Sequence, residues 1–278
     1  MLNRMTWALA LAAVAGVAVL VWAFGPAAPV GPAEGRPVAD VEYSAGLRMD
    51  LCVPPGDGPF PAVICLHGGG WTGGDRKQWT QTLAVLARRG FVAAAPQMRL
   101  APKHSAADML DDVRAAAAWL RSRPEYKIDP KRVGVMGRSS GGHLALLAAA
   151  TRPADFQAVA AFSAPVDLAD PAMHAPDLLT KNLIPLLGGK PAERADAYRA
   201  ASPLWYDLKG MPPVFLAHGS DDRLVPLAHV QAFKSKVGAA DGRCHLIVME
   251  GEGHAWRGAN LLRGIDKILT FLDETLKK

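Results

Sequence analysis

Five residues in the middle of the chain, Gly137-Arg138-Ser139-Ser140-Gly141, carry the pattern Gly-x-Ser-x-Gly. An apolar run at 133–136 precedes them and an Ala/Leu-rich run at 142–150 follows, which predicts a strand, a sharp turn and a helix. Such a turn holds its central hydroxyl above the sheet edge, and the flanking glycines let strand and helix pass closely. Only Ser139 has glycine two positions away on both sides. We therefore expect Ser139 to be a nucleophile and Ser140 to supply a backbone amide.

A second stretch with chemical potential, His67-Gly68-Gly69-Gly70-Trp71, follows an apolar run at 62–66 that is typical of a buried strand. Successive glycines leave backbone N–H groups free to point into a cleft. There they can stabilise the oxyanion of an acyl-transfer intermediate. The alternative interpretation is a flexible turn without a catalytic part.

A serine nucleophile needs a base, and the base needs a carboxylate that orients it. Among eight histidines, His254 alone follows a last sheet strand in a glycine-rich loop downstream of the nucleophile and of an acidic loop. We expect His67 to order the glycine loop and His218 to make a structural hydrogen bond. Asp221 and Asp222 both follow the penultimate strand, so position alone leaves the acid open.

The elements that must position these residues alternate between strand-like and helix-like runs from residue 62 onward. This alternation predicts βαβ units and a parallel sheet, with the loops after its strands at one carboxyl edge. Runs at 38–44 and 47–53 indicate an antiparallel hairpin beside that sheet. A helix is expected to begin after Ser105, which has the character of an N-cap.

The stretch 167–202 breaks the alternation with prolines, scattered charges and short helical fragments. We interpret it as a small cap inserted over the carboxyl edge of the sheet. A surface loop that does not cover the site is the alternative.

The amino-terminal 35 residues differ in character from the remainder, residues 36–278, which we expect to form one domain. After Arg4 comes an uncharged apolar run at 6–24, and then a stretch rich in Pro, Ala and Gly. This order predicts an export signal or an amino-terminal membrane anchor followed by a linker. The protein is therefore expected to be exported: periplasmic, secreted, or anchored to the outer face of the cytoplasmic membrane. Cleavage of the segment is left open.

Composition excludes several other classes of function. The net charge of +5 is spread along the chain without a block of Lys or Arg, so a nucleic-acid partner has no support. Cys52, Cys65 and Cys244 form no metal-ligand pair by spacing and are expected to be buried free thiols, one disulfide being the alternative. The sequence carries no signal of oligomeric state.

Several motifs together resemble the α/β-hydrolase superfamily, specifically the esterase/lipase group related to hormone-sensitive lipase and to bacterial feruloyl and acetyl-xylan esterases. They are HGGGW, RLAP, DDVRAAAAWL, GRSSGGHLA, ASPLWY, HGSDDRLVP and GEGHAW, and they extend over most of the chain from about Leu47 to Leu276. The resemblance implies an α/β-hydrolase fold with a mostly parallel central sheet flanked by helices. It maps the acid onto Asp222 and an oxyanion hole onto the amides of Gly69 and Gly70, joined by that of Ser140.

Two segments depart from the pattern of the group. The elbow carries Arg138 and Ser140, where relatives often have an acidic or other residue and alanine, and His254 is followed by Ala255-Trp256 instead of Gly-Phe. Both departures are expected to change the pocket.

The function expected from these residues is hydrolysis of a small-molecule carboxylic ester through a covalent acyl-enzyme, without a metal or organic cofactor. An amide-cleaving relative, such as an aminopeptidase or arylformamidase, is the nearest alternative because the same triad serves both bonds. A non-catalytic binding protein on this fold is a more distant one. The bulky Trp71 is expected to close the pocket and to favour short acyl chains.

Overall fold

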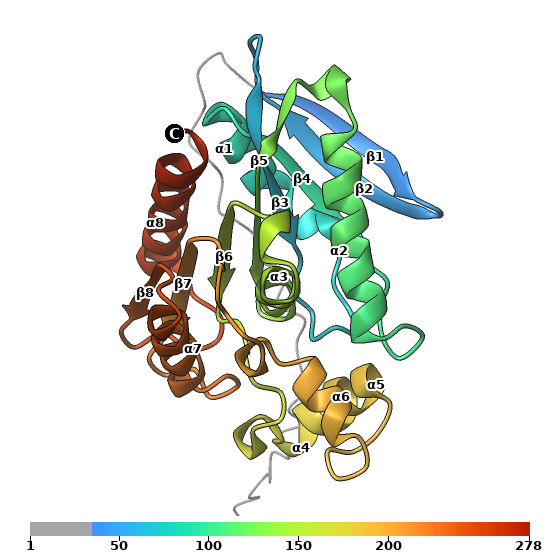
Figure 1. The fold of residues 1–278 in the computed structure, drawn as a ribbon, viewed down its shortest axis with the longest axis vertical. Helices are drawn as coiled ribbons and strands as arrows, with labels where there is room; N and C mark the ends of the chain where they lie inside the picture. The colour runs from blue at the N-terminus through green and yellow to red at the C-terminus, as the bar shows by residue number, and fades with distance from the viewer. Residues whose placement is uncertain (1–34) are drawn as a thin grey trace, which may run out of the picture.

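The computed structural model describes residues 35–278, so the predicted export signal or anchor lies outside the described residues. An eight-stranded sheet with the order β1-β2-β4-β3-β5-β6-β7-β8 runs through the described chain (Figure 1). The strands are β1 (Arg36–Ser44), β2 (Leu47–Val53), β3 (Phe60–Leu66), β4 (Val92–Pro96), β5 (Ile128–Arg138), β6 (Ala158–Phe162), β7 (Val214–Gly219) and β8 (Cys244–Met249). The α-helices are α1 (Thr80–Arg88), α2 (Ala106–Arg121), α3 (Ser140–Thr151), α4 (Pro176–Leu178), α5 (Ile184–Leu187), α6 (Ala195–Ala200), α7 (Leu227–Ala239) and α8 (Gly258–Leu276).

The pairing confirms the predicted mixture of parallel and antiparallel strands. β1 pairs with β2, and β2 with β4, in antiparallel register, whereas the pairs β4-β3, β3-β5, β5-β6, β6-β7 and β7-β8 are parallel. Because the carboxyl ends of parallel strands meet at one edge, the loops that follow β3, β5, β7 and β8 gather there.

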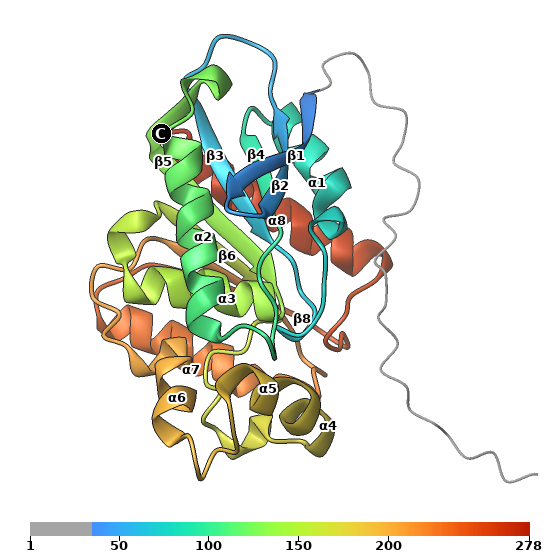
Figure 2. The same ribbon diagram turned by 90° about the vertical axis from the view of Figure 1, so that its right-hand side faces the viewer.

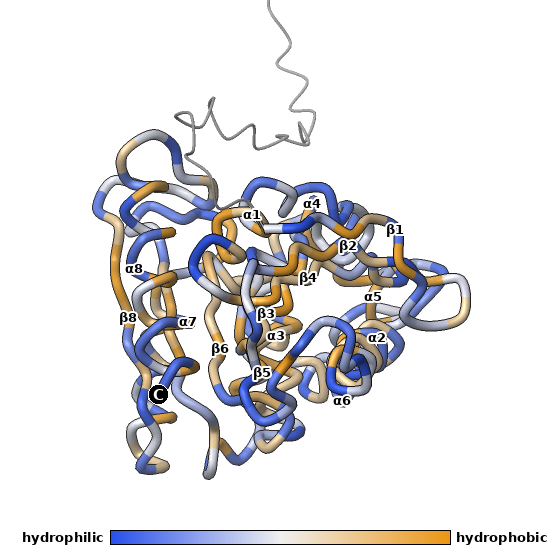
Figure 3. Tube along the Cα trace, turned by 90° about the horizontal axis from the view of Figure 1, so that it is seen from above, coloured by the Kyte–Doolittle hydropathy of each residue, from blue (hydrophilic) through white to orange (hydrophobic). Residues whose placement is uncertain are grey.

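Helices cover both faces of the sheet and bury two separate apolar cores. Along β3, Ala62, Ile64 and Leu66 belong to the core beneath α2, α3 and α7, whereas Val63 and Cys65 belong to the core beneath α1 and α8. This strict alternation follows from the two-residue period of a strand. The hydrophobic residues accordingly follow the strands, for example β4 and β8, while α7 and α8 carry hydrophilic stretches (Figure 3).

The predicted start of the second long helix is confirmed in its details. Ser105 caps α2 by accepting a hydrogen bond from the N–H of Asp108, and the Asp108 carboxylate accepts one from the N–H of Ser105. This reciprocal capping box satisfies two amides that a helix start would otherwise leave open.

The segment between β6 and β7, which the sequence predicts as a cap, consists of short helical pieces. They are the 3₁₀ turn η4 (Pro171–Met173), α4, the π-helical turn η5 (Leu179–Leu183), α5 and α6. The helices α4, α5 and α6 lie together beyond the carboxyl ends of the strands (Figures 1 and 2). At its beginning the Asp170 carboxylate lies 3.0 Å from Nε2 of the buried His229 on α7. We call the segment 167–202 the cap.

All three cysteines are free thiols. Cys52 and Cys65 are buried as expected, but Cys244 is only half-buried because it begins β8 at the edge of the sheet. Among residues 35–278, no helix combines the length and the apolar character that crossing a membrane requires.

Candidate active site

Ser139 occupies the sharp turn between β5 and α3 that its flanking glycines predict. Its backbone has φ 53° and ψ −123°. This conformation is energetically unfavourable for any residue that carries a Cβ. The turn is held from both sides, because the N–H of Ser139 donates to the carbonyl of Phe162 at 2.8 Å and its own carbonyl accepts from the N–H of His143 at 2.9 Å. A Cβ at Gly141 would collide with the carbonyl oxygen of Leu66, which explains the glycine there.

The side chains of three segments meet at this turn. Nε2 of His254 lies 2.9 Å from Oγ of Ser139, and Nδ1 of His254 lies 2.8 Å from Oδ2 of Asp222. Since a carboxylate only accepts, Nδ1 carries the proton and Nε2 is left to accept from the serine hydroxyl. The alternative acid, Asp221, is exposed and accepts a hydrogen bond from the hydroxyl of Ser220 instead.

The electrostatic surroundings favour an ionised Asp222. Burial by itself raises the pKa of this carboxyl, but the hydrogen bond and charge of His254 and the amide of Val225 outweigh burial and hold the pKa below its ordinary value. The neighbouring His218 is fully buried, and burial lowers its pKa, so it stays neutral. Its Nε2 lies 2.9 Å from the carbonyl of Val225, as expected of a structural histidine.

The glycine loop lies directly beside the serine. A Cβ built on Gly68 would be 3.5 Å from the Cβ of Ser139. Gly69 has φ 137° and Gly70 has φ 62°, so both adopt backbone conformations that favour glycine. Within residues 35–278 the N–H groups of Gly69 and Gly70 donate no hydrogen bond, which leaves them available to a ligand. His67 orders this loop only in part, with Nδ1 3.2 Å from the carbonyl of Gly68.

Trp71 does not occupy the position expected from the sequence. Its indole is buried in the core, where Nε1 donates to Nδ1 of His143 at 3.1 Å and the two rings meet edge to face. Nε2 of His143 therefore carries the proton and donates to the carbonyl of Ala201 in the cap at 2.6 Å. Complete burial lowers the pKa of His143 to about 4. This link between glycine loop, elbow helix and cap carries no local signal in the sequence.

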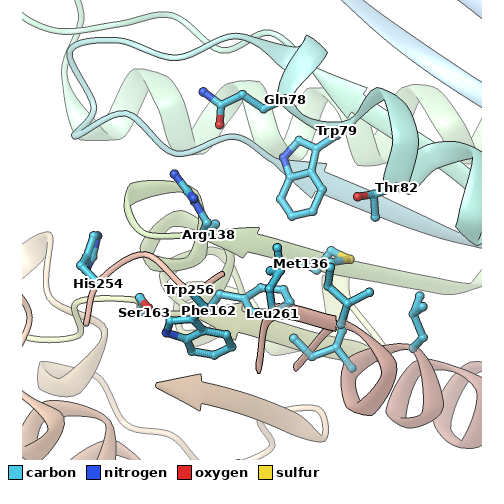
Figure 4. Close-up of a pocket in the computed structure, with 13 residues that line it drawn as sticks. Gln78, Trp79, Thr82, Met136, Arg138, Phe162, Ser163, His254, Trp256 and Leu261 are labelled. Atoms are coloured by element: carbon cyan, nitrogen blue, oxygen red, sulfur yellow. The ribbon is translucent and has the colours of Figure 1, made fainter. Parts of the chain in front are cut away.

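An apolar pocket reaches His254 from the side of α1 and α8 (Figure 4). Its cavity volume is about 60 Å³. Its walls are Gln78, Trp79, Thr82, Met136, Arg138, Phe162, Ser163, His254, Trp256, Leu261, Ile265, Ile268 and Leu269. Arg138 and Trp256, two of the positions where the sequence departs from the pattern of its relatives, both line this pocket, and Trp71 does not. Burial lowers the pKa of Arg138 to about 10, so its guanidinium stays charged at neutral pH.

The site contains the parts of acyl-transfer chemistry: a hydroxyl, an imidazole aligned by a carboxylate, and open amides beside them. Within residues 35–278 no cluster of three His, Cys, Asp or Glu side chains could hold a metal ion.

Comparison with known families identifies the family of this chain. A model of the BD-FAE family matches residues 49–237, which is more than half of the sequence. The chain belongs to the BD-FAE family. The match includes Ser139 and Asp222 and ends before His254.

This BD-FAE member is also similar to individual esterases. It is 29% identical over 215 residues, 69% of this chain and 49% of the relative, to the probable carboxylic ester hydrolase LipM of Mycobacterium tuberculosis. The chain spans about half the length of the curated relatives it matches.

Among solved structures, esterase 2 of Thermogutta terrifontis phosphonylated by sarin is 26% identical, with a TM-score of 0.72 over 85% of this chain and 94% of that one. The same esterase with butyrate bound is 26% identical, with a TM-score of 0.69 over the same shares of the two chains. A truncated carbohydrate esterase from gut microbiota, 22% identical, has a TM-score of 0.77 over 90% of this chain and 99% of that one. The BD-FAE protein therefore has the α/β-hydrolase fold that its motifs imply.

Proposed function

We propose that this BD-FAE protein is a serine carboxylesterase. The observation that carries the proposal is the unbroken line of hydrogen bonds from Oγ of Ser139 through His254 to Asp222. Its similarity to LipM and to esterase 2 of Thermogutta terrifontis, both named for ester hydrolysis, supports the same conclusion. The sarin-phosphonylated form of the latter is the product expected when such an esterase reacts with an organophosphonate.

The proposed reaction follows from the direction of the hydrogen bonds. Nε2 of His254 accepts the hydroxyl proton while Oγ of Ser139 bonds to the ester carbonyl carbon, which gives a tetrahedral oxyanion. The imidazolium is stabilised by ionised Asp222 and returns the proton to the leaving alkoxide, so an alcohol departs and an acyl-serine remains. Water then repeats the sequence with His254 as base and releases the carboxylic acid.

We assign the oxyanion to the N–H groups of Gly69, Gly70 and Ser140. The first two are open in the glycine loop beside the serine, and the third is the first amide of α3, where the helix leaves its N–H groups unsatisfied. Donors that are fixed before the reaction stabilise charge as it develops without reorganising.

The proposed substrates are esters with short acyl chains. The pocket beside His254 is lined by the rings of Trp79, Phe162 and Trp256 rather than by the expected Trp71. Each methylene that the pocket buries adds about 0.8 kcal/mol, and a chain that outgrows the pocket gains nothing further. The butyrate bound to the related esterase 2 is a ligand of this size.

Hydrolysis of p-nitrophenyl esters with acyl chains from two to sixteen carbons tests the proposal. We expect kcat/KM to be highest for acetyl to butyryl esters and to fall steeply beyond about eight carbons. A maximum at twelve carbons or longer would indicate a lipase. Turnover of anilides or aminoacyl amides at rates above those of esters would indicate the amide-cleaving alternative. Absence of both turnover and labelling by a fluorophosphonate would indicate a binding protein.

We also propose that the protein is exported and acts outside the cytoplasm, with the apolar run at 6–24 as its signal or anchor. Fractionation of cells that express the full chain tests this. Esterase activity in the periplasm, the medium or the membrane fraction is expected, and activity confined to the cytoplasm would contradict it. A chain that lacks residues 1–28 is the matched control, because it should stay in the cytoplasm.

A further inference from the structure

A cap residue that no catalytic motif contains contacts the glycine loop directly. Asn182 lies in the turn η5, and its Nδ2 donates to the carbonyl of Gly70 at 2.9 Å and to Oγ1 of Thr72 at 3.0 Å. The contact is close, since a Cβ on Gly70 would lie 3.0 Å from Cγ of Asn182. The side-chain amide of Asn182 therefore packs directly against Gly70, which carries one of the proposed oxyanion donors.

The loop needs such a contact because glycine does not fix its own backbone. Gly69 and Gly70 lack the Cβ that restricts rotation in other residues, so each peptide plane can turn at little cost. The carbonyl of Gly69 is held by the N–H of Gly73 at 3.0 Å, and the carbonyl of Gly70 is held by Asn182. A planar peptide joins the carbonyl of one residue to the N–H of the next, so the bond to the Gly69 carbonyl orients the N–H of Gly70. The bond from Asn182 fixes the following peptide, and the two bonds together limit rotation on both sides of Gly70.

We propose that Asn182 is a positioning residue of the esterase, which acts through Gly70 to hold the oxyanion loop in its productive orientation. This inference rests on the proposed function. It makes the cap part of the catalytic apparatus, beyond any role in covering the substrate. The hydrogen bond from His143 to Ala201 attaches the cap to α3 at a second point. This attachment helps to hold Asn182 beside the glycine loop.

The decisive variants are Asn182→Asp, which keeps the shape but replaces the N–H donors by carboxylate oxygens facing Gly70, and Asn182→Ala, which removes the amide without adding charge. Loss of an entire oxyanion donor lowers kcat by about 100- to 1,000-fold, so a loosened donor should lower kcat by about 10- to 100-fold. KM should change by less than about threefold, since Asn182 acts on the charge of the transition state rather than on the bound ester.

The matched control is Lys181→Ala, on the same turn, whose exposed side chain pairs only with Asp177 among the described residues. Its kcat should equal that of the wild type. Thr72→Val keeps the Asn182 amide but removes its second acceptor, so a drop of about threefold is expected from a weaker anchor. This variant keeps the inference testable if the Asn182 variants do not fold, which their thermal unfolding curves will report.

A second readout separates positioning from a loosened cap. Phosphonylation of Ser139 by a small fluorophosphonate also develops charge at the oxyanion site, so its rate constant should fall in step with kcat in the Asn182 variants. A kcat within twofold of the wild type, or a change confined to KM, would overturn the role of Asn182. A wild type that neither hydrolyses esters nor reacts with the probe would overturn the proposed function itself.

Discussion

His143 should make the protein unusually sensitive to mild acid. Its pKa is lowered by burial to about 4, against 6.5 for an ordinary histidine. Between these values the unfolded chain binds a proton that the folded protein does not, so the free energy of unfolding falls as the pH falls. The loss begins near the unfolded value of 6.5 and stops only when folded His143 itself protonates near pH 4.

The expected loss of unfolding free energy follows from the size of the pKa shift of His143. One pKa unit corresponds to about 1.4 kcal/mol, so lowering the pH from about 7 to about 5 should remove about 2 kcal/mol through this residue. His143 is 0% exposed, so solvent does not screen its charge. Asp222 does not contribute in this window. Its carboxyl has a lowered pKa in the folded protein, so its stabilising contribution is lost only when the pH falls below about 3.8, the ordinary value.

Urea denaturation of the wild type and of His143→Gln at the two pH values measures the effect. A glutamine can accept from Trp71 and donate to Ala201, but it does not titrate. The wild type should lose about 2 kcal/mol more than the variant between about pH 7 and pH 5. The buried His67 and His218, whose pKa values burial also lowers, contribute equally to both proteins and cancel. Equal losses in the two proteins would refute the assignment of this acid sensitivity to His143.

Three further predictions concern the reaction. Ser139→Ala should abolish ester turnover and fluorophosphonate labelling. Ser140→Ala should keep most activity because its backbone amide remains. Comparable activities of the two variants would refute Ser139 as the nucleophile. Asp222→Asn should lower kcat by about 10⁴-fold while Asp221→Asn changes it little, since only Asp222 contacts His254, and the reverse ranking would move the acid by one residue. Trp256→Ala should enlarge the pocket and raise kcat/KM for hexanoyl relative to acetyl esters by about 10-fold, as measured on the p-nitrophenyl series, and an unchanged ratio would remove Trp256 from the acyl pocket.

The sequence predicts the fold well because each element carries its own local signal. Glycine spacing around Ser139, the serine cap of α2 and the alternation of strands and helices are all readable over a few residues, and the structure has each of them. The structure also brings Ser139, Asp222 and His254 within hydrogen-bond distance. Their catalytic roles remain predictions for the variants above.

The sequence could not predict the contacts that join distant segments. Asn182 is 112 residues from Gly70 and sits among the irregular turns of the cap, where no periodic pattern marks one polar side chain above another. Trp71 was expected at the pocket wall because it follows the glycines. Its backbone instead turns at φ 63° and carries the indole into the core, toward a histidine 72 residues away.

The placement of the cap between two neighbouring parallel strands has a consequence for how this protein could diversify. β6 and β7 are adjacent in the sheet, so the whole cap enters and leaves the fold at almost one place. A single recombination event could therefore exchange it for another without changing strand order. The graft would have to supply its own amide donor for Gly70 and its own carbonyl for His143. Transplanted caps that lack these two groups should yield folded proteins with poor turnover, which limits the caps that evolution or a protein engineer can use.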